Sequence, residues 1–436
     1  MTTTSKASLL IVNEDGLVAG RGNSTRALLP EVEVAPGRVG ISLSRAVREQ
    51  LQLEVFCLVL PYTSDLPFHV LRLQSADGVL PPGFLWMQLG SFPECDVIGK
   101  ALEHFSSSDS NFARFAWYQE IVEWLNHHVG RLGYEIRRLE QWNGRVGGVL
   151  IRVVSSGPDF WFKAVSDFNA REFWIAQLLA ERHPGRFPKV LASGPRWNAF
   201  LLEHIFGEEL HGCNDLSVWK QVAELLADTQ VRWIGESKKL LVAGAADLRP
   251  LALIGKIPEF LQYVASAMAR QEKMPPSILG RPELAKLGDE LRALCSEVAA
   301  FPFAEALANS DFSPHNTLLT GTGPMFIDWA EACVSFPLIV GEYMWNRMAI
   351  EAPTRVGWQK ILRETYLHRW ASYYSSEVVQ NAARLLPSFA VFALLVFLHE
   401  REGNGPSEYD LYLRSLARRL KREVDQLELG ALTSAS

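Results

Sequence analysis

The stretch from residue 309 to residue 331, NSDFSPHNTLLTGTGPMFIDWAE, decides the interpretation of this chain. Two short apolar runs, NTLLT and PMFID, lie on either side of a glycine-containing turn, and this pattern predicts a β-hairpin. Asp311 and Asn316 lie just before the first predicted strand, and Asp328 ends the second. Because a hairpin brings those two ends together, we expect two carboxylates and one amide to meet there.

These three side chains suit the chemistry of phosphoryl transfer. That reaction needs a carboxylate to orient and deprotonate an attacking hydroxyl, and oxygen ligands that hold Mg²⁺ against the phosphates. Taken singly, Asp311, Asn316 and Asp328 would be ordinary loop and turn residues. Their order and spacing favour a joint role.

The motifs D-F-S-P-H-N and F-I-D-W resemble the signature of the aminoglycoside phosphotransferase and choline kinase superfamily, roughly H-G-D-x-x-x-x-N, a hairpin, then I-D-W. The resemblance covers about residues 133–345. It implies an α+β, two-lobed protein kinase-like fold, with a small antiparallel-sheet lobe and a helical lobe. It also implies that Asp311 is the catalytic base and that Asn316 and Asp328 bind Mg²⁺. Asn309 stands where the family has a His that supports the catalytic loop, a role that an Asn amide can partly replace.

A second expectation concerns the region upstream. Three strand-like runs between residues 134 and 166 precede a helical pattern at 169–182, which predicts an antiparallel sheet with one helix. A kinase-like small lobe needs a strand lysine for the α- and β-phosphates, paired with a glutamate on the next helix. Lys163 and Glu172 fit these two positions. Lys163 alone would be interpreted as an edge-strand lysine that faces water.

Other nucleotide contacts follow from the same resemblance. Gly147 and Gly148 belong to a hairpin turn that would fold over the phosphates, although such dipeptides are also ordinary turns. The run from Phe200 to Leu210 resembles the linker between lobes, where the backbone near Glu203 and Ile205 would meet a purine.

The substrate pocket is expected around the loop after the second hairpin strand. Trp329 and Glu331 lie in that loop and Glu342 in the helix that follows. Acidic side chains suit an amine-bearing substrate, but each residue alone fits a structural role equally. The resemblance implies that the donor is ATP or GTP and that the acceptor is a hydroxyl of an aminoglycoside or amino sugar, a nucleoside or an amino alcohol. The alternative is a nucleotide-binding pseudokinase.

The first 130 residues form short strand-like runs, with helical patterns at 42–53 and 112–128 and with Ser42 or Ser44 as N-cap of the first. Residues 28–55, with LPPGFLWMQL from Leu80, resemble the Nudix hydrolases, whose signature is G-x5-E-x7-R-E-U-x-E-E-x-G-U. This resemblance implies an α/β/α domain.

The metal-binding positions of that signature are degenerate. In an alignment on Arg48 and Glu49, Gly40, Gln52 and Leu53 replace the other metal-binding glutamates. One carboxylate cannot assemble the usual divalent site, so we expect the fold without the hydrolase. Its role could be non-catalytic recognition, covering of the kinase cleft, a homodimer surface or structural support.

Changes in hydrophobic period divide the chain into three predicted domains, at residues 1–130, 131–209 and 210–436. The net charge of −6 with scattered basic residues argues against nucleic acid as a partner. The most apolar window, from Phe389, is shorter than the ~20 residues that span a bilayer, which predicts a core helix and no membrane partner. Five widely spaced cysteines and the absence of a signal-peptide pattern favour a reducing, cytoplasmic location.

Overall fold

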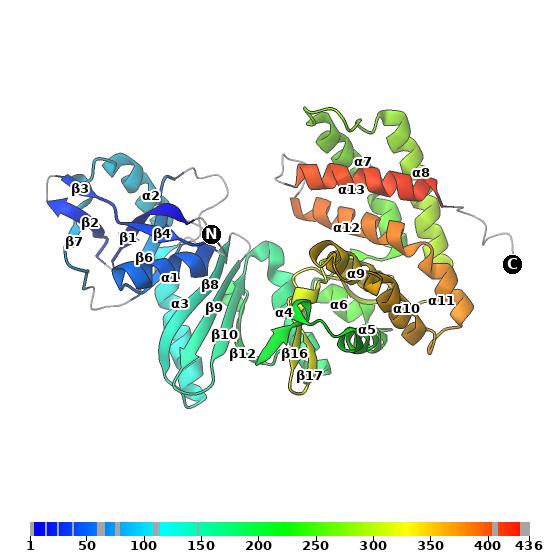
Figure 1. Cartoon of the computed structure of the whole chain (residues 1–436), viewed down its shortest axis with the longest axis horizontal. Coiled ribbons are helices and arrows are strands. Elements are labelled where there is room, and N and C mark those ends of the chain that lie inside the picture. The colour runs from blue at the N-terminus through cyan, green and yellow to red at the C-terminus, as the bar shows by residue number, and fades with distance from the viewer. Residues whose placement is uncertain are drawn as a thin grey trace. The chain divides into compact units, whose positions relative to one another are not determined.

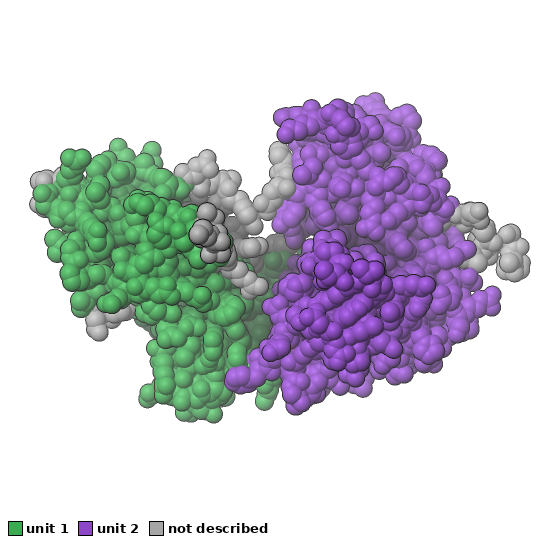
Figure 2. Space-filling model, in the orientation of Figure 1, with its two compact units in different colours: residues 1–173, 189–204 green, residues 174–188, 205–436 purple. Residues whose placement is uncertain are grey.

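The computed structural model describes residues 4–13, 15–23, 26–36, 39–58, 66–74, 79–107, 112, 114–145, 148–402 and 409–427. The chain forms two compact units (Figure 2). Unit 1 comprises Met1–Phe173 and Lys189–His204, and unit 2 comprises Trp174–Pro188 and Ile205–Ser436. The chain crosses from unit 1 to unit 2 for the last time between His204 and Ile205. This crossing lies within the run from Phe200 to Leu210 that was expected to link two lobes.

Unit 1 begins with a seven-stranded sheet in which β1 is central, in the order β3-β2-β1-β6-β5, with β4 on β1 and β7 on β2. Alternation along β1 sends Leu9 and Ile11 to the core under α1, and Leu10 and Val12 to the core under α2 and α3. The sheet is therefore covered on both faces (Figure 1). Its elements are β1 (Ser5–Val12), β2 (Val18–Asn23), β3 (Arg26–Leu28), β4 (Glu31–Val34), α1 (Val39–Leu51), β5 (Val55–Cys57), β6 (His69–Leu73), β7 (Leu85–Met87), α2 (Cys95–Ser107) and α3 (Phe115–Arg131).

Two helix predictions in this region need correction. Helix α1 begins at Val39, so Ser42 and Ser44 lie inside the helix and the N-cap prediction is wrong. The helix starts three residues earlier than predicted, and Gly40 is buried in its first turn. Helix α3 begins three residues later than predicted, and α2 was not predicted at all.

The second sheet of unit 1 is antiparallel throughout, as predicted, in the order β11-β12-β10-β9-β8. Its inward residues, such as Ile151 and Phe162, share one core with Trp117 and Leu125 of α3. The fully buried amide of Gln141 also bonds both backbone groups of Cys57, at 2.8 and 2.9 Å. The strands are β8 (Ile136–Arg145), β9 (Gly148–Ser155), β10 (Phe160–Val165), β11 (Val190–Gly194) and β12 (Ala199–Glu203), with α4 (Ala170–Arg182) after β10.

Unit 2 is mainly helical and contains two three-stranded sheets, β13-β16-β17 and β14-β18-β15. The predicted hairpin is formed by β16 and β17. The strands are β13 (Gly207–Glu209), β14 (Ala246–Leu248), β15 (Ala306–Asn309), β16 (Thr317–Thr320), β17 (Gly323–Phe326) and β18 (Ala332–Ser335). The helices are α5 (Leu216–Val231), α6 (Ser237–Val242), α7 (Pro250–Ala269), α8 (Arg281–Ala300), α9 (Ile339–Glu351), α10 (Trp358–Trp370), α11 (Ser376–Ala383), α12 (Leu386–Glu402) and α13 (Asp410–Asp425).

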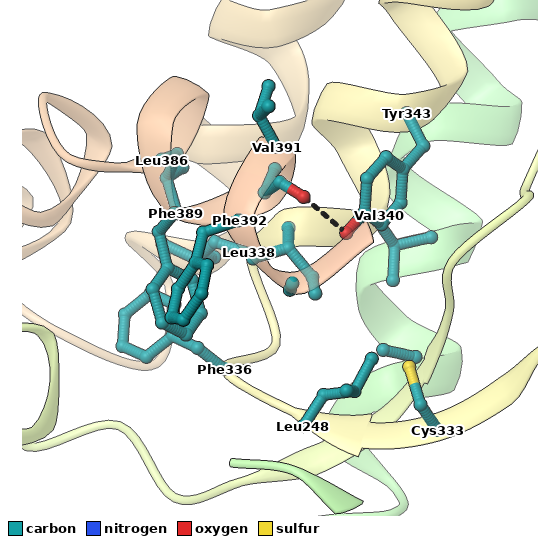
Figure 3. Packing of buried hydrophobic residues seen from close by; sticks show 14 of the residues in the cluster. Leu248, Cys333, Phe336, Leu338, Val340, Tyr343, Leu386, Phe389, Val391 and Phe392 are labelled. Atoms are coloured by element: carbon teal, nitrogen blue, oxygen red, sulfur yellow. Dashed lines mark hydrogen bonds between the residues drawn. The ribbon is translucent and has the colours of Figure 1, made fainter. Parts of the chain in front are cut away.

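Helix α12 lies in the core of unit 2, as the sequence predicted. Phe389 and Phe392 are fully buried, and Phe389 packs against Phe336 with ring centroids 6.3 Å apart (Figure 3). The Tyr343 hydroxyl of α9 donates a 2.8 Å hydrogen bond to the carbonyl of Ala390, which fixes α9 against α12 (Figure 3). In the described part of the chain no single helix has the length and hydropathy of a membrane span; α11 and α12 meet that criterion only together, across a 56° bend.

Candidate active site

The hairpin brings Asn316 and Asp328 to the same end, as expected from the sequence. Thr317 of β16 pairs with Phe326 of β17. One step further, the Ile327 N–H donates a 2.9 Å hydrogen bond to the carbonyl of Asn316. The two predicted metal ligands therefore flank the first rung of the ladder.

A second pair of strands holds the start of the loop that carries Asp311. Asn309 of β15 pairs with Ala332 of β18, and the Ser310 N–H donates to the Glu331 carbonyl at 3.1 Å. The loop between β15 and β16 is thus fastened at both ends to the segment that contains Asp328. This is why the three predicted residues lie together.

The side chain of Asn309 connects the two halves of the site directly. It is fully buried, its Nδ2 donates to the Asp328 carbonyl at 3.0 Å, and its Oδ1 accepts from the Asp311 N–H at 2.9 Å. An amide provides both a donor and an acceptor, so Asn309 performs the loop-supporting hydrogen bonding that the sequence had assigned to a His position.

Asp328 has a left-handed backbone, with φ of +59°. Such a conformation costs a non-glycine residue on the order of 1 kcal/mol and persists where surrounding contacts enforce it. The bond from Asn309 to its carbonyl is one such contact. The strained position coincides with a predicted metal ligand, as is common at functional sites.

The carboxylate of Asp311 is held by an arginine from α9. Arg347 Nη2 donates to Asp311 Oδ1 at 3.1 Å, and its Nε lies 3.6 Å from Glu351 Oε1. Although 55% of the Asp311 side chain is accessible, the protein atoms that crowd the carboxyl raise its pKa. Arg347 partly opposes this effect and the nearby charge of Asp328 adds to it. The Asp311 carboxylate is thus more readily protonated than that of an ordinary aspartate.

The donor set fits Mg²⁺. Asn316 uses its Nδ2 to donate to the Asp311 carbonyl at 3.3 Å, which turns its Oδ1 away from that carbonyl. No donor among the described residues meets this Oδ1. One amide oxygen and the carboxylate of Asp328 match the few hard oxygen ligands that Mg²⁺ takes from a protein.

In unit 1, the structure joins Lys163 and Glu172 in an ion pair. Lys163 lies on β10, the central strand, between β9 and β12, so the alternative of an edge-strand lysine is wrong. Its side chain is 21% exposed and that of Glu172 is 4% exposed. A lysine at such a position needs its partner, because an isolated charge is costly to bury. Its role in nucleotide binding stays a prediction.

The remaining predicted nucleotide contacts are two glycines of a hairpin turn and two residues of the linker between lobes. Gly147 lies outside the described residues. A Cβ at Gly148 would lie 2.8 Å from the Ala164 carbonyl oxygen, so strand packing alone requires glycine there. Glu203 exchanges hydrogen bonds with the backbone of Lys189, and Ile205 is half-buried at the start of the second segment of unit 2.

Two of the predicted substrate residues are inaccessible. Trp329 is 4% exposed and packs against Phe187. Glu342 is 5% exposed, its pKa is raised by burial, and it is paired with Arg363 at 2.6 Å. These two side chains therefore serve the core, which corrects the expectation that solvent-borne substrate meets them. Glu331 is half-buried, and its role in substrate binding stays a prediction.

Arg347 was not among the residues predicted from the sequence. The residue lies 36 positions after Asp311, and its local pattern is only that of a helix arginine four residues before Glu351. Nothing in the sequence reveals which loop that helix face meets.

The degenerate positions of the N-terminal domain have structural roles. Gln52 takes a left-handed φ of +56° at the end of α1, and Leu53 is buried in the core. Glu49 is exposed. Within the described ranges, the N-terminal domain has no group of three His, Cys, Asp or Glu side chains with ligand atoms close together.

The fold of this chain is similar to that of known small-molecule kinases, whereas sequence comparison finds no relative. No family model matches the sequence, and no curated protein matches it. The structure is similar to that of a choline kinase from Cryptosporidium parvum, with 14% identity, a TM-score of 0.50 and coverage of 73% of this chain and 99% of that chain. The chain has a kinase-like fold. This confirms the predicted α+β kinase-like class, whereas the Nudix likeness stays a prediction.

Two further kinase-like structures have lower TM-scores. One is an ethanolamine kinase from Plasmodium vivax, with 15% identity, a TM-score of 0.49 and coverage of 74% of this chain and 94% of that chain. The other is APH(2″)-IIa, in a ternary complex with streptomycin and ATP, with 15% identity, a TM-score of 0.43 and coverage of 70% and 95%.

Proposed function

We propose that the protein is a Mg²⁺-dependent phosphotransferase that moves the γ-phosphate of ATP or GTP to a hydroxyl of a small molecule. The observation that carries this proposal is the Asn309 side chain, which binds the backbone of Asp311 and of Asp328 together. A buried residue that fixes a base relative to a metal ligand is what positioning catalysis requires.

In this proposal each side chain has a defined task. Asp311 orients the acceptor hydroxyl and takes its proton, while the hydroxyl oxygen bonds to the γ-phosphorus and the bond from that phosphorus to the β,γ-bridging oxygen breaks. Asn316 and Asp328 would hold Mg²⁺, which offsets charge on the phosphates. Lys163, oriented by Glu172, would bind the α- and β-phosphates. ADP or GDP leaves with the bridging oxygen.

The test is a nucleotide-consumption screen with Mg²⁺ over aminoglycosides and amino sugars, nucleosides and amino alcohols. Acceptor-dependent consumption should fall about 10²–10⁴-fold in Asp311→Asn, because a positioned base contributes on this scale. Asp289→Asn, which changes an 82% exposed carboxylate on α8, is the matched control. The proposal fails if Asp311→Asn turns over like the control.

A second candidate is a nucleotide-binding pseudokinase. The pairing of Asp311 with Arg347 favours it, since an arginine already occupies one oxygen of the base. This candidate predicts Mg²⁺-dependent nucleotide binding, measured by calorimetry, without phosphate transfer to any acceptor of the screen. Transfer that depends on Asp311 would exclude it.

For the N-terminal domain we propose a Nudix-like fold that recognises a ligand without hydrolysing it. The sheet covered by helices on both faces supports the fold, and the use of Gln52 and Leu53 in chain packing supports the loss of hydrolysis. Residual hydrolysis of nucleoside diphosphate derivatives is the competing idea. It predicts activity in the full chain that disappears in Glu49→Gln.

A further inference from the structure

Unit 2 contains a second cluster of polar side chains that the proposed phosphotransfer does not use. His211 comes from the short 3-10 turn Leu210–Gly212, His315 from the turn Pro314–Asn316, and Glu351 from the last position of α9. One potential ligand atom from each of the three lies within 4.8 Å of the others. The two imidazole rings are stacked, with centroids 4.2 Å apart and planes 21° apart.

The distances in the cluster suit a metal ion. His315 Nε2 lies 3.4 Å from Glu351 Oε2, and His211 Nδ1 lies 3.6 Å from the same oxygen. In a tetrahedral zinc site with bonds of about 2.1 Å, ligand atoms stand about 3.4 Å apart. The two separations from Glu351 are close to this value, and the third pair of ligand atoms lies within 4.8 Å.

A neighbouring carboxylate orients one of the ligands. His315 Nδ1 and Glu209 Oε2 form a short hydrogen bond, and the pairing of Glu209 with Leu318 fixes this glutamate on β13. If Nδ1 carries the proton, the lone pair of Nε2 faces Glu351. A carboxylate that accepts from the outer nitrogen of a metal-binding histidine is the usual support of such ligands.

The other histidine is also held in place. Arg355 Nη2 donates to the carbonyls of His211 and Cys213, at 2.6 and 3.0 Å, which fixes the turn. His211 Nδ1 is buried, and no hydrogen-bond partner for it exists among the residues that the structure describes. A buried ring nitrogen without a partner is costly in a protein, and a metal ion would satisfy it.

We propose that His211, His315 and Glu351 bind a divalent transition metal ion of the zinc type, with Glu209 as the outer partner of His315. Two imidazoles and one carboxylate are ligands that zinc takes in proteins, with a fourth position open to water. The side chains are 25–42% exposed, so the ion can enter from solvent. The site is separate from the proposed Mg²⁺ ligands and does not depend on the phosphotransferase proposal.

The ion would tie together three segments that meet at the candidate active site. His315 is the residue before Asn316, and Glu351 shares α9 with Arg347. A bound ion would therefore restrain the loop of the proposed base from one side. The competing description is a network of protonated histidines and carboxylates that binds no metal.

The experiment is calorimetric titration of Zn²⁺ into the untagged, chelator-treated full chain, in excess Mg²⁺. We expect one Zn²⁺ per chain. His211→Ala and His315→Ala should each weaken binding at least about 100-fold, and Glu209→Gln about 10–100-fold, as outer partners do. His368→Ala, which removes an exposed histidine of α10, should leave the affinity unchanged.

A folding control separates the loss of a metal ligand from the loss of folded protein. Circular dichroism should show that each variant is folded, and Glu351→Gln, a conservative change, should also lose binding. The proposal is overturned if the wild-type chain binds no Zn²⁺, or if it binds Zn²⁺ no more tightly than a His211→Ala/His315→Ala double variant.

Discussion

Asn309 and Asp328 are joined by a 3.0 Å hydrogen bond from the amide of the first to the backbone carbonyl of the second. Asp328 is at the same time one of the few described non-glycine residues with a positive φ. The side-chain oxygen of Asn309 accepts a hydrogen bond from the N–H of Asp311. One buried side chain therefore sets both the loop of the proposed base and the strained turn of the proposed metal ligand.

Replacement of Asn309 by alanine should leave the Asp311 N–H and the Asp328 carbonyl without this partner. We expect a loss of about 1–3 kcal/mol in the free energy of unfolding, the usual cost of unsatisfied buried groups. Turnover should fall more than nucleotide affinity. Urea unfolding and steady-state kinetics measure the two effects, with Asn381→Ala on α11 as control. An unchanged unfolding midpoint would contradict the bridging role.

Replacement of Arg347 by alanine should change the pH dependence of activity. Arg347 lowers the pKa of Asp311, which burial and Asp328 raise, so its removal lets that pKa rise further. A base with a higher pKa becomes protonated at higher pH as the solution is acidified. The acidic limb of the kcat/KM profile should therefore move to higher pH. A limb in the wild-type position, or the same shift in the control Arg384→Ala, would rule this out.

Asp328→Asn should separate metal binding from backbone conformation. Asparagine tolerates the left-handed region and keeps the carbonyl that Asn309 contacts, so only the carboxylate is lost. We expect the Mg²⁺ concentration for half-maximal activity to rise at least about tenfold. The unfolding free energy should change by less than about 1 kcal/mol. Equal Mg²⁺ requirements in the variant and the wild type would remove Asp328 from the ligand set.

Lys163→Met tests the ion pair in unit 1. The change leaves the buried carboxylate of Glu172 without its lysine, which should cost about 3 kcal/mol of stability and weaken nucleotide binding. In the double variant with Glu172→Met, stability should largely return while nucleotide binding stays weak. If the double variant recovers both properties, Lys163 does not bind the nucleotide.

His183 should shape the stability of unit 2 in acid. It is 2% exposed between Phe187 and Trp233, and burial, with Arg232 and Arg182 nearby, lowers its pKa from 6.5 to about 4. The unfolded chain therefore takes up this proton at higher pH than the folded chain. The contribution of uncharged His183 to the free energy of unfolding is fully present above pH 6.5. It is lost as the pH falls towards 4, and amounts to on the order of 2 kcal/mol.

His183→Phe keeps an aromatic ring in that place but cannot be protonated. Urea unfolding at a series of pH values should then show a shallower loss of stability between pH 6.5 and 4 than in the wild type. Identical slopes in the two proteins would show that this histidine is not responsible.

The parts that could be predicted from sequence are those in which local patterns also determine neighbours. The β16–β17 hairpin was predicted because two short apolar runs joined by a glycine-containing turn pair with each other. This pairing brings Asn316 near Asp328. The strand of Lys163 and its pairing with Glu172 were predicted, whereas the central place of that strand in the sheet comes from the structure alone. Parts that depend on packing across long distances were missed, such as the contact from Arg347 to Asp311 and the partners of His315.

The predicted start of α1 and the predicted exposure of Trp329 were wrong because the local sequence shows neither feature. The apolar pattern did not show that α1 begins at Val39. It also did not show that Trp329 packs against Phe187, which is far away in sequence. A sequence shows that Trp329 is close to Asp328 along the chain. It does not show that the indole turns into the core.

The core shared between α3 and the second sheet has a consequence for how the chain tolerates change. Phe162, next to Lys163 on β10, is fully buried against Trp117 of α3. Helix α3 thus supports the strand that carries this lysine. A substitution of a buried residue in α3 would therefore displace Lys163. Positions sensitive to mutation should accordingly lie outside the kinase-like motifs as well as within them.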